Sequence, residues 1–141
     1  MKRYLLDTSL LASLLLDRPA AVELIRPWIV GREVATSILV YAEVCEYLKG
    51  FSDIPQHHAA LRMLLREVHP YTLTFPTLER YADVRRSMRR RQPGLIGDVD
   101  TLIAATALER GLQVVTADRD FERVPDLGVR LIPRSALELR R

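Results

Sequence analysis

The stretch that most constrains the fold is the N-terminal sequence MKRYLLDTS. Its apolar run Tyr4–Leu6 is short enough for a buried parallel strand and is followed at once by Asp7. The next apolar run, Leu10–Leu16, predicts a helix that Thr8 or Ser9 could cap. A strand that turns directly into a helix places Asp7 at the carboxyl edge of a sheet, where α/β proteins bind ligands. A role for Asp7 as a simple cap or turn residue remains open.

Short strand patterns alternate with helical patterns along the rest of the chain. After Tyr4–Leu6, strands are expected at residues 33–36, 69–75, 112–116 and 130–132. Helices are expected at residues 10–16, 20–30, 38–48, 54–68, 76–91, 100–110 and 133–139. Connections of this kind suit right-handed crossovers between parallel strands. We therefore predict an α/β fold, a three-layer α/β/α sandwich with a mostly parallel central sheet.

Composition narrows the functional classes. The 141 residues predict a single domain, residues 1–141, that can bury a sizeable core. Cys45 is the only cysteine, which excludes an intramolecular disulfide and a thiolate cluster and favours a reducing, cytoplasmic location. No apolar run reaches membrane-spanning length, and Asp7 interrupts the stretch that most resembles a signal peptide. The net charge of +3 mildly favours binding to polyanionic partners.

Two further sites carry acids within or at the start of helices. Glu43 lies in the mostly apolar stretch VYAEVCEYL, where a buried carboxylate needs a partner or a metal. A solvated face shared with Glu46 is the alternative. Asp98 and Asp100 lie at or just before a helix start, where the helix dipole favours acids. One cap needs only one of these two acids, so the second is available for another role.

A last acidic segment repeats the arrangement seen at Asp7. A short apolar run ends at Thr116, and Asp118 and Asp120 follow. If the two strand ends are neighbours, Asp7 and Asp118 converge, and a helix start can bring Asp100 to the same edge. Clustered carboxylates repel one another unless a cation lies among them, and hard oxygen ligands suit Mg²⁺ or Mn²⁺. Such an ion can activate water and neutralise a phosphodiester, which is the chemistry of a metal-dependent nuclease.

Four motifs together resemble the signatures of PIN-domain ribonucleases: LLDTS, the YAEV of Tyr41–Val44, GDVDTLIAATAL and VVTADRDF. The resemblance extends from Tyr4 to about Ile132 and is strongest to VapC-type toxins of type II toxin–antitoxin pairs. The catalytic, metal-binding acids of that family fall on Asp7, Glu43, Asp100 and Asp118. Supporting positions fall on Thr8, Ser9, Asp98, Thr116 and Asp120.

This resemblance implies a Mg²⁺-dependent endoribonuclease in which Mn²⁺ is a possible substitute ion. It also implies an RNA substrate, a homodimer and a cognate VapB-type antitoxin. Any DNA contact would be indirect, through that antitoxin. No membrane partner is expected.

A basic cluster near the middle of the chain has two possible roles. It consists of Arg85, Arg86, Arg89, Arg90 and Arg91, at the end of an expected helix. Cations in a last helical turn are favoured by the helix dipole alone. The same side chains could hold an RNA backbone, because a nuclease needs groups that position phosphates. The sequence leaves both roles open.

Two other functions compete with a nuclease. A haloacid-dehalogenase-type phosphatase also has an Asp after its first strand, but the residue two positions later is usually a second acid and here is Ser9. A non-catalytic PIN-like module that binds a partner is the other alternative, although all four expected acids are present.

The sequence does not indicate a zinc site. The histidines His57, His58 and His69 lack the spacing of zinc ligands.

Overall fold

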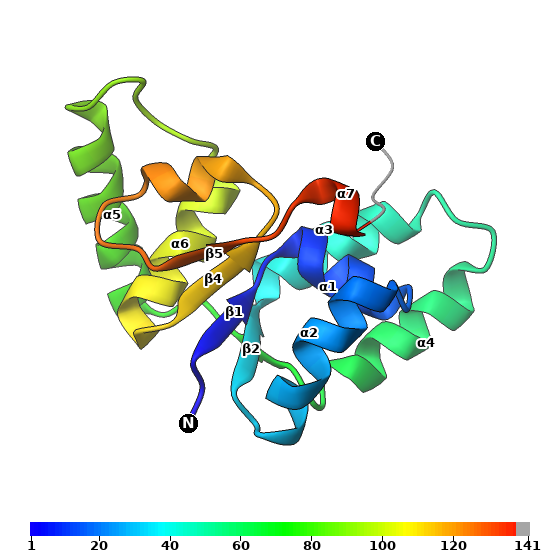
Figure 1. The fold of residues 1–141 in the computed structure, drawn as a ribbon. Coiled ribbons are helices and arrows are strands. Elements are labelled where there is room, and N and C mark those ends of the chain that lie inside the picture. Colours follow the sequence, from blue (N-terminus) through cyan, green and yellow to red (C-terminus); the bar gives the residue numbers. More distant parts are fainter. Residues whose placement is uncertain (138–141) are drawn as a thin grey trace.

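A computed structural model describes residues 1–137 and places five strands in one fully parallel sheet, in the order β3-β2-β1-β4-β5 (Figure 1). The strands are β1 (Tyr4–Leu6), β2 (Val34–Ser37), β3 (His69–Tyr71), β4 (Gln113–Thr116) and β5 (Val129–Leu131). The helices are α1 (Thr8–Leu15), α2 (Pro19–Val30), α3 (Ile38–Leu48), α4 (Ile54–Leu64), α5 (Phe75–Arg89), α6 (Asp98–Arg110) and α7 (Arg134–Leu137), with a 3-10 helix η1 (Arg119–Arg123). The expected α/β class and parallel sheet are confirmed.

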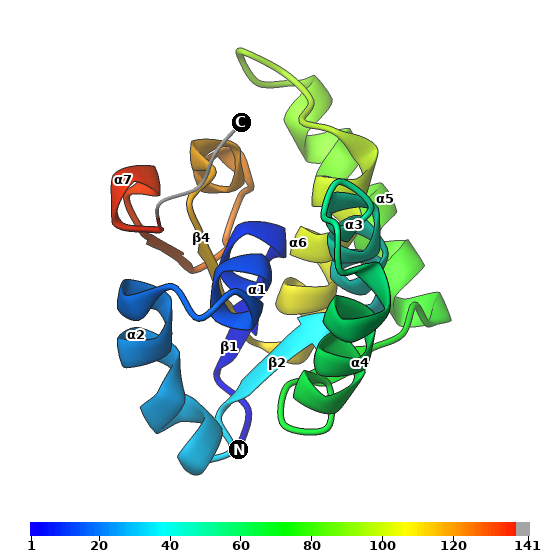
Figure 2. The same ribbon diagram turned by 90° about the vertical axis from the view of Figure 1, so that its right-hand side faces the viewer.

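Helices cover both faces of the sheet, as expected for three layers. Figure 2 shows α2 and α7 to one side of β1 and β4, with α5 and α6 to the other. The central strand β1 is buried along its whole length, which explains why Tyr4, Leu5 and Leu6 are all apolar. In α6, Ala104 and Ala107 are fully buried, and these small side chains let the helix pack closely on its neighbours.

The order of the strands creates a switch point between β1 and β4. The chain leaves β1 for β2 on one side and later returns to β4 on the other. Leu5 pairs with Val114 and Leu6 with Val115, so the two strands end level with each other. Ligands in open α/β sheets bind outside the carboxyl ends of strands at such a point. Asp7 and Asp118 follow these two ends.

Several elements begin or end away from their expected bounds, because local hydrogen bonds decide the ends. Helix α1 begins at Thr8 rather than residue 10, since the Asp7 side chain caps it by accepting a hydrogen bond from the Leu10 N–H. Strand β3 stops at Tyr71, because Thr74 and Thr77 form a capping box that starts α5.

The other ends move by a few residues. Helix α4 ends at Leu64 rather than residue 68, and α6 begins at Asp98 rather than residue 100. The last expected helix starts near its expected position, and its expected end at residue 139 lies outside the described residues. In the part of the chain that the structure describes, no helix is long and apolar enough to cross a bilayer.

Candidate active site

Four carboxylates from four separate elements line one pocket at the carboxyl edge of the sheet. Asp7 follows β1, Glu43 lies on α3, Asp100 lies in the first turn of α6, and Asp118 follows β4. The pocket has a volume of about 350 Å³. Its lining is completed by Thr8, Ser9, Ala12, Tyr47 and Arg134. The structure therefore brings together all four acids that the sequence motifs single out.

Asp7 is the most buried of these acids, with 5% of its surface exposed. Its carboxylate accepts hydrogen bonds from the Ser9 hydroxyl at 2.7 Å, from the Leu10 N–H at 3.3 Å and from the Thr116 hydroxyl. Burial raises the pKa of Asp7 to about 6, against the lowering effect of these hydrogen bonds, and the charge of Asp118 raises it further. Asp7 is thus both a helix cap and a buried acid.

The hydroxyl of Thr116 joins the ends of β1 and β4. It donates to Asp7 and accepts a hydrogen bond from the Asp118 N–H at 2.9 Å. On the other side of Asp7, the Ser9 hydroxyl accepts from the Ala117 N–H at 3.2 Å. These bonds fix the position of Asp7 relative to Asp118, as a preorganised site requires.

Glu43 is held by a hydroxyl from another helix. Ser37 caps α3 by accepting from the Leu39 N–H at 3.1 Å, which sets the start of the helix. Glu43 is half-buried on this helix, and the Thr8 hydroxyl donates a hydrogen bond to its carboxylate. The expectation that a carboxylate in this apolar segment needs a partner is met by Thr8.

Asp100 is affected by every other acid of the site. Burial is the largest cause that raises its pKa to about 6, followed by the negative charges of Asp118, Glu43, Asp7 and Asp120. A group that feels four like charges lies in a region of concentrated negative potential. A bound cation would remove this repulsion.

Two of the expected supporting acids lie outside the pocket. The carboxylate of Asp98 points to α5, where it pairs with Arg85 and accepts a hydrogen bond from the Tyr81 hydroxyl at 3.2 Å. Asp120 forms an ion pair with Arg123 at 3.4 Å and acts on the site only through its charge. The other three supporting residues, Thr8, Ser9 and Thr116, bond directly to catalytic candidates.

The basic cluster does not line the pocket. Arg85 is engaged by Asp98, and the remaining arginines, Arg86, Arg89, Arg90 and Arg91, are exposed at or just beyond the end of α5. Three lining residues, Ala12, Tyr47 and Arg134, were missed by the sequence reasoning. Tyr47 stands four residues after Glu43, and this helical spacing could have placed it on the same face. No spacing in the sequence indicated that Arg134 would line the pocket.

The donor set fits a hard divalent cation. The available ligands are carboxylate oxygens and hydroxyls, which suit Mg²⁺ or Mn²⁺. Among residues 1–137, no three His, Cys, Asp or Glu side chains already form a compact metal cluster. This arrangement still suits Mg²⁺, because that ion usually takes only one or two carboxylates directly and keeps several water ligands.

The family model described as the PIN domain matches residues 4–127. The chain belongs to the PIN-domain family. PIN domains are generally nucleases and typically use divalent metal ions. All four carboxylates of the pocket lie within the part of the chain that the PIN-domain model matches.

Solved structures with the same fold include chains of VapBC complexes. A chain of VapBC2 from Rickettsia felis, bound to a DNA fragment from its promoter, is 21% identical over 91% of this chain and 97% of that chain, with a TM-score of 0.79. A chain of DNA-bound VapBC from Salmonella typhimurium is 20% identical over 92% and 98%, with a TM-score of 0.81. A chain of FitAcB from Neisseria gonorrhoeae is 23% identical over 96% and 99%, with a TM-score of 0.73. These similarities show the shared PIN fold. No curated protein shows significant sequence similarity to the chain.

Proposed function

We propose that this PIN domain is a Mg²⁺-dependent endoribonuclease and the toxin of a VapBC-type toxin–antitoxin pair. The observation that carries the proposal is the convergence of Asp7, Glu43, Asp100 and Asp118 on one pocket at the switch point of the sheet. Raised pKa values at Asp7 and Asp100 support it, because crowded acids of this kind favour a cation.

The four acids come from different elements but would share one role, which is to hold the metal ion. Mg²⁺, when bound, supplies charge neutralisation for a phosphodiester and acidifies water. Asp7, Glu43, Asp100 and Asp118 would hold the ion directly or through water. Hydrogen bonds from Thr116, Ser9 and Thr8 hold two of the carboxylates in place. The raised pKa values mean that Asp7 and Asp100 give up their last protons near neutral pH, so metal binding and proton release are coupled.

A pair of neighbouring variants tests this assignment. Asp100→Asn should lower RNA cleavage by about a hundredfold or more, because it removes a charge from the pocket. Asp98→Asn should change cleavage by only about twofold, because Asp98 faces Arg85 on an exposed surface. Cleavage of purified RNA is measured with Mg²⁺ and with EDTA, and EDTA should abolish the activity of the wild-type protein.

Four outcomes would contradict the proposal. Cleavage that survives EDTA would rule out the metal, and equal losses in the two variants would remove the special role of Asp100. Hydrolysis of small phosphomonoesters without RNA cleavage would favour a phosphatase. Intact folding with neither activity would favour the non-catalytic module.

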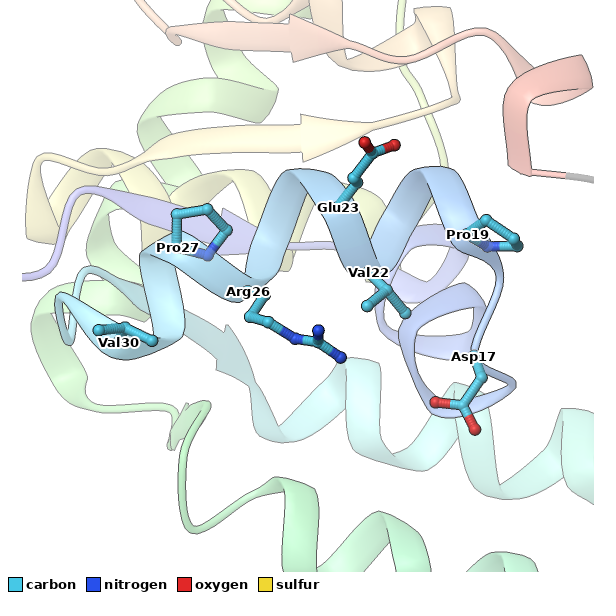
Figure 3. A pocket seen from close by; sticks show the side chains of 7 residues that line it. All are labelled: Asp17, Pro19, Val22, Glu23, Arg26, Pro27 and Val30. Carbon is cyan, nitrogen blue, oxygen red and sulfur yellow. The ribbon is translucent and has the colours of Figure 1, made fainter.

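An apolar groove between α2 and α4 supports the antitoxin part of the proposal. Figure 3 shows the lining of an adjoining hollow on α2, where Val22 and Val30 also line the groove. The groove continues to Met63 on α4, and Val30 and Met63 are 80% and 65% exposed. Exposed apolar side chains in a groove are typical of a protein-binding surface. An amphipathic segment of a VapB-type antitoxin would bury them.

Exposed apolar side chains on α3 and α5 support the homodimer. Phe75 is 82% exposed and Leu78 is 42% exposed, both in the first turns of α5, and Ile38 at the start of α3 is 37% exposed. These side chains belong to elements other than those of the antitoxin groove. We therefore assign the two proposed partners to different parts of the surface.

Light scattering tests both assemblies in one experiment. The protein alone should have about twice the 16.1 kDa mass of one chain, and adding the antitoxin encoded beside it should raise this mass. Met63→Glu should keep the dimer but weaken antitoxin binding by about tenfold or more, because it puts a charge in an apolar groove. The control is Ala59→Glu, which adds the same charge at an exposed position of α4 outside the groove.

Two results would count against these assemblies. A monomeric mass at micromolar concentration contradicts the dimer. Equal antitoxin binding by the Met63→Glu and Ala59→Glu variants contradicts the proposed groove.

A further inference from the structure

A second hollow adjoins the carboxylate pocket and shares Arg134 with it. Its volume is about 340 Å³, at the small end of the range for ligand pockets. Its lining consists of Ala117, Arg119, Leu131, Ile132, Pro133 and Arg134. In the chain, Asp118 lies between two of these lining residues but itself lines the carboxylate pocket. The two hollows therefore meet at Arg134.

The backbone that carries Arg134 is tied to the strand that carries Asp118. Strand β5 pairs with β4, where Leu131 is opposite Thr116, and the Ile132 N–H donates to the Thr116 carbonyl at 2.7 Å. Arg134 begins α7 directly afterwards, and the fully buried Leu137 anchors this short helix. The position of Arg134 beside Asp118 is thus fixed by the sheet.

Arg119 and Arg134 differ from the other arginines around the site. Both are exposed, and within residues 1–137 neither makes a hydrogen bond or an ion pair. By contrast, Arg85 is paired with Asp98, and Arg123 is held by Asp120 and by the carbonyls of residues 94 and 95. Among the described residues, Arg119 and Arg134 are therefore two cations beside the site that can take an external anion.

We propose that Arg134 and Arg119 hold the RNA phosphate next to the scissile one, and that the hollow they line receives the attached nucleotide. A guanidinium binds a phosphate through two parallel hydrogen bonds and keeps its charge at every relevant pH. Positive charge beside four carboxylates also offsets the repulsion that a polyanion meets there. This inference rests on the proposed endoribonuclease function.

The chemistry of the hollow points to a single-stranded substrate. Leu131, Ile132 and Pro133 contribute an apolar part of the lining, which suits the face of a sugar or base. Single-stranded loops and tails can place an unpaired base in such a hollow, whereas paired bases in an RNA helix stay stacked. Arg134 and Arg119 are therefore substrate-positioning residues for an unpaired segment of RNA.

The experiment compares Arg134→Ala, Arg119→Ala and Arg134→Lys with the control Arg66→Ala. Arg66 is exposed just after α4 and before β3, at the opposite edge of the sheet, so the control removes the same charge far from the site. Each alanine variant at the hollow should raise KM for single-stranded RNA about tenfold with little change in kcat. Each should also reduce the slope of log affinity against log salt by about one. Arg134→Lys should restore part of the loss, and the control should match wild type.

A binding assay keeps this test separate from catalysis. The anisotropy of a labelled, mixed-sequence single-stranded RNA is measured in EDTA, and the same variants should weaken binding. If wild type binds RNA without cleaving it and the two alanine variants bind it more weakly, the endoribonuclease function fails while the RNA-binding role of the two arginines remains. If wild type cleaves RNA but the variants behave as the control does, the inference about the two arginines fails and the proposed endoribonuclease function stands. Lost antitoxin binding with unchanged RNA binding would assign the arginines to the protein partner and overturn the proposal.

Discussion

Replacing Asp7 by Asn is expected to lower Mg²⁺-dependent RNA cleavage by about a thousandfold or more while the protein still folds. Asn has the shape of Asp, and its carbonyl oxygen can still accept the hydrogen bond from the Leu10 N–H that caps α1. The substitution removes the negative charge of the most buried acid in the pocket. Cleavage of RNA and circular dichroism of the same sample measure the two effects.

The matched control is Asp17→Asn, at the opposite end of α1. Asp17 is exposed and does not line the carboxylate pocket. Its backbone φ of 55° lies in the left-handed region, which Asn also tolerates. This control should cleave RNA as wild type does. Undiminished cleavage by Asp7→Asn would remove Asp7 from the active site.

Without metal, the stability of the protein is expected to fall as the pH rises through about 6. The pKa of Asp7 is about 6 in the folded protein and 3.8 in the unfolded reference, so the folded state binds the proton more tightly between these values. The stabilisation that this bound proton gives the folded protein is fully present below the unfolded pKa and is lost as the pH rises through the folded pKa. At neutral pH the buried charge of Asp7 lowers the free energy of unfolding by on the order of 3 kcal/mol, because each pKa unit corresponds to about 1.36 kcal/mol.

Thermal unfolding in EDTA measures this effect. Raising the pH from about 5 to about 7.5 should lower the unfolding free energy by about 1 kcal/mol for Asp7, because only part of the titration falls in that range. Asp7→Asn should raise Tm at the higher pH by several degrees, since it removes the buried charge. Mg²⁺ should stabilise wild type more than this variant. If Asp7→Asn leaves Tm unchanged at both pH values, Asp7 acts only as a cap.

Sequence reasoning placed the acids on the correct edge of the sheet because that step depends on local order. A strand that is followed directly by an acid and a helix places that acid at the carboxyl edge of the sheet, whatever position the strand takes in the strand order. Asp7 and Asp118 meet only because β1 pairs with β4, and the periodicity of either strand does not encode its partner. The recurrence of the same pattern after both strands made this pairing a reasonable expectation.

The remaining placements depend on how distant elements pack. Asp98 and Asp100 are two residues apart on α6, but packing of α5 against α6 directs Asp98 to Arg85 and leaves Asp100 at the pocket. Arg134 reaches the pocket because β5 and α7 return to the site at the end of the fold. Such contacts between remote segments leave no periodic signal in the sequence.

The pairing of β1 with β4 also determines when the pocket can exist during synthesis. Asp7 is among the first residues made, but Thr116 and Asp118, which complete its surroundings, follow more than a hundred residues later. A nascent chain that ends before them contains the first three acids without the strand that aligns them. Contacts of such long sequence separation also form late in folding. The carboxylate pocket is therefore incomplete until the C-terminal strands have been made and paired, and the proposed nuclease activity would begin only then.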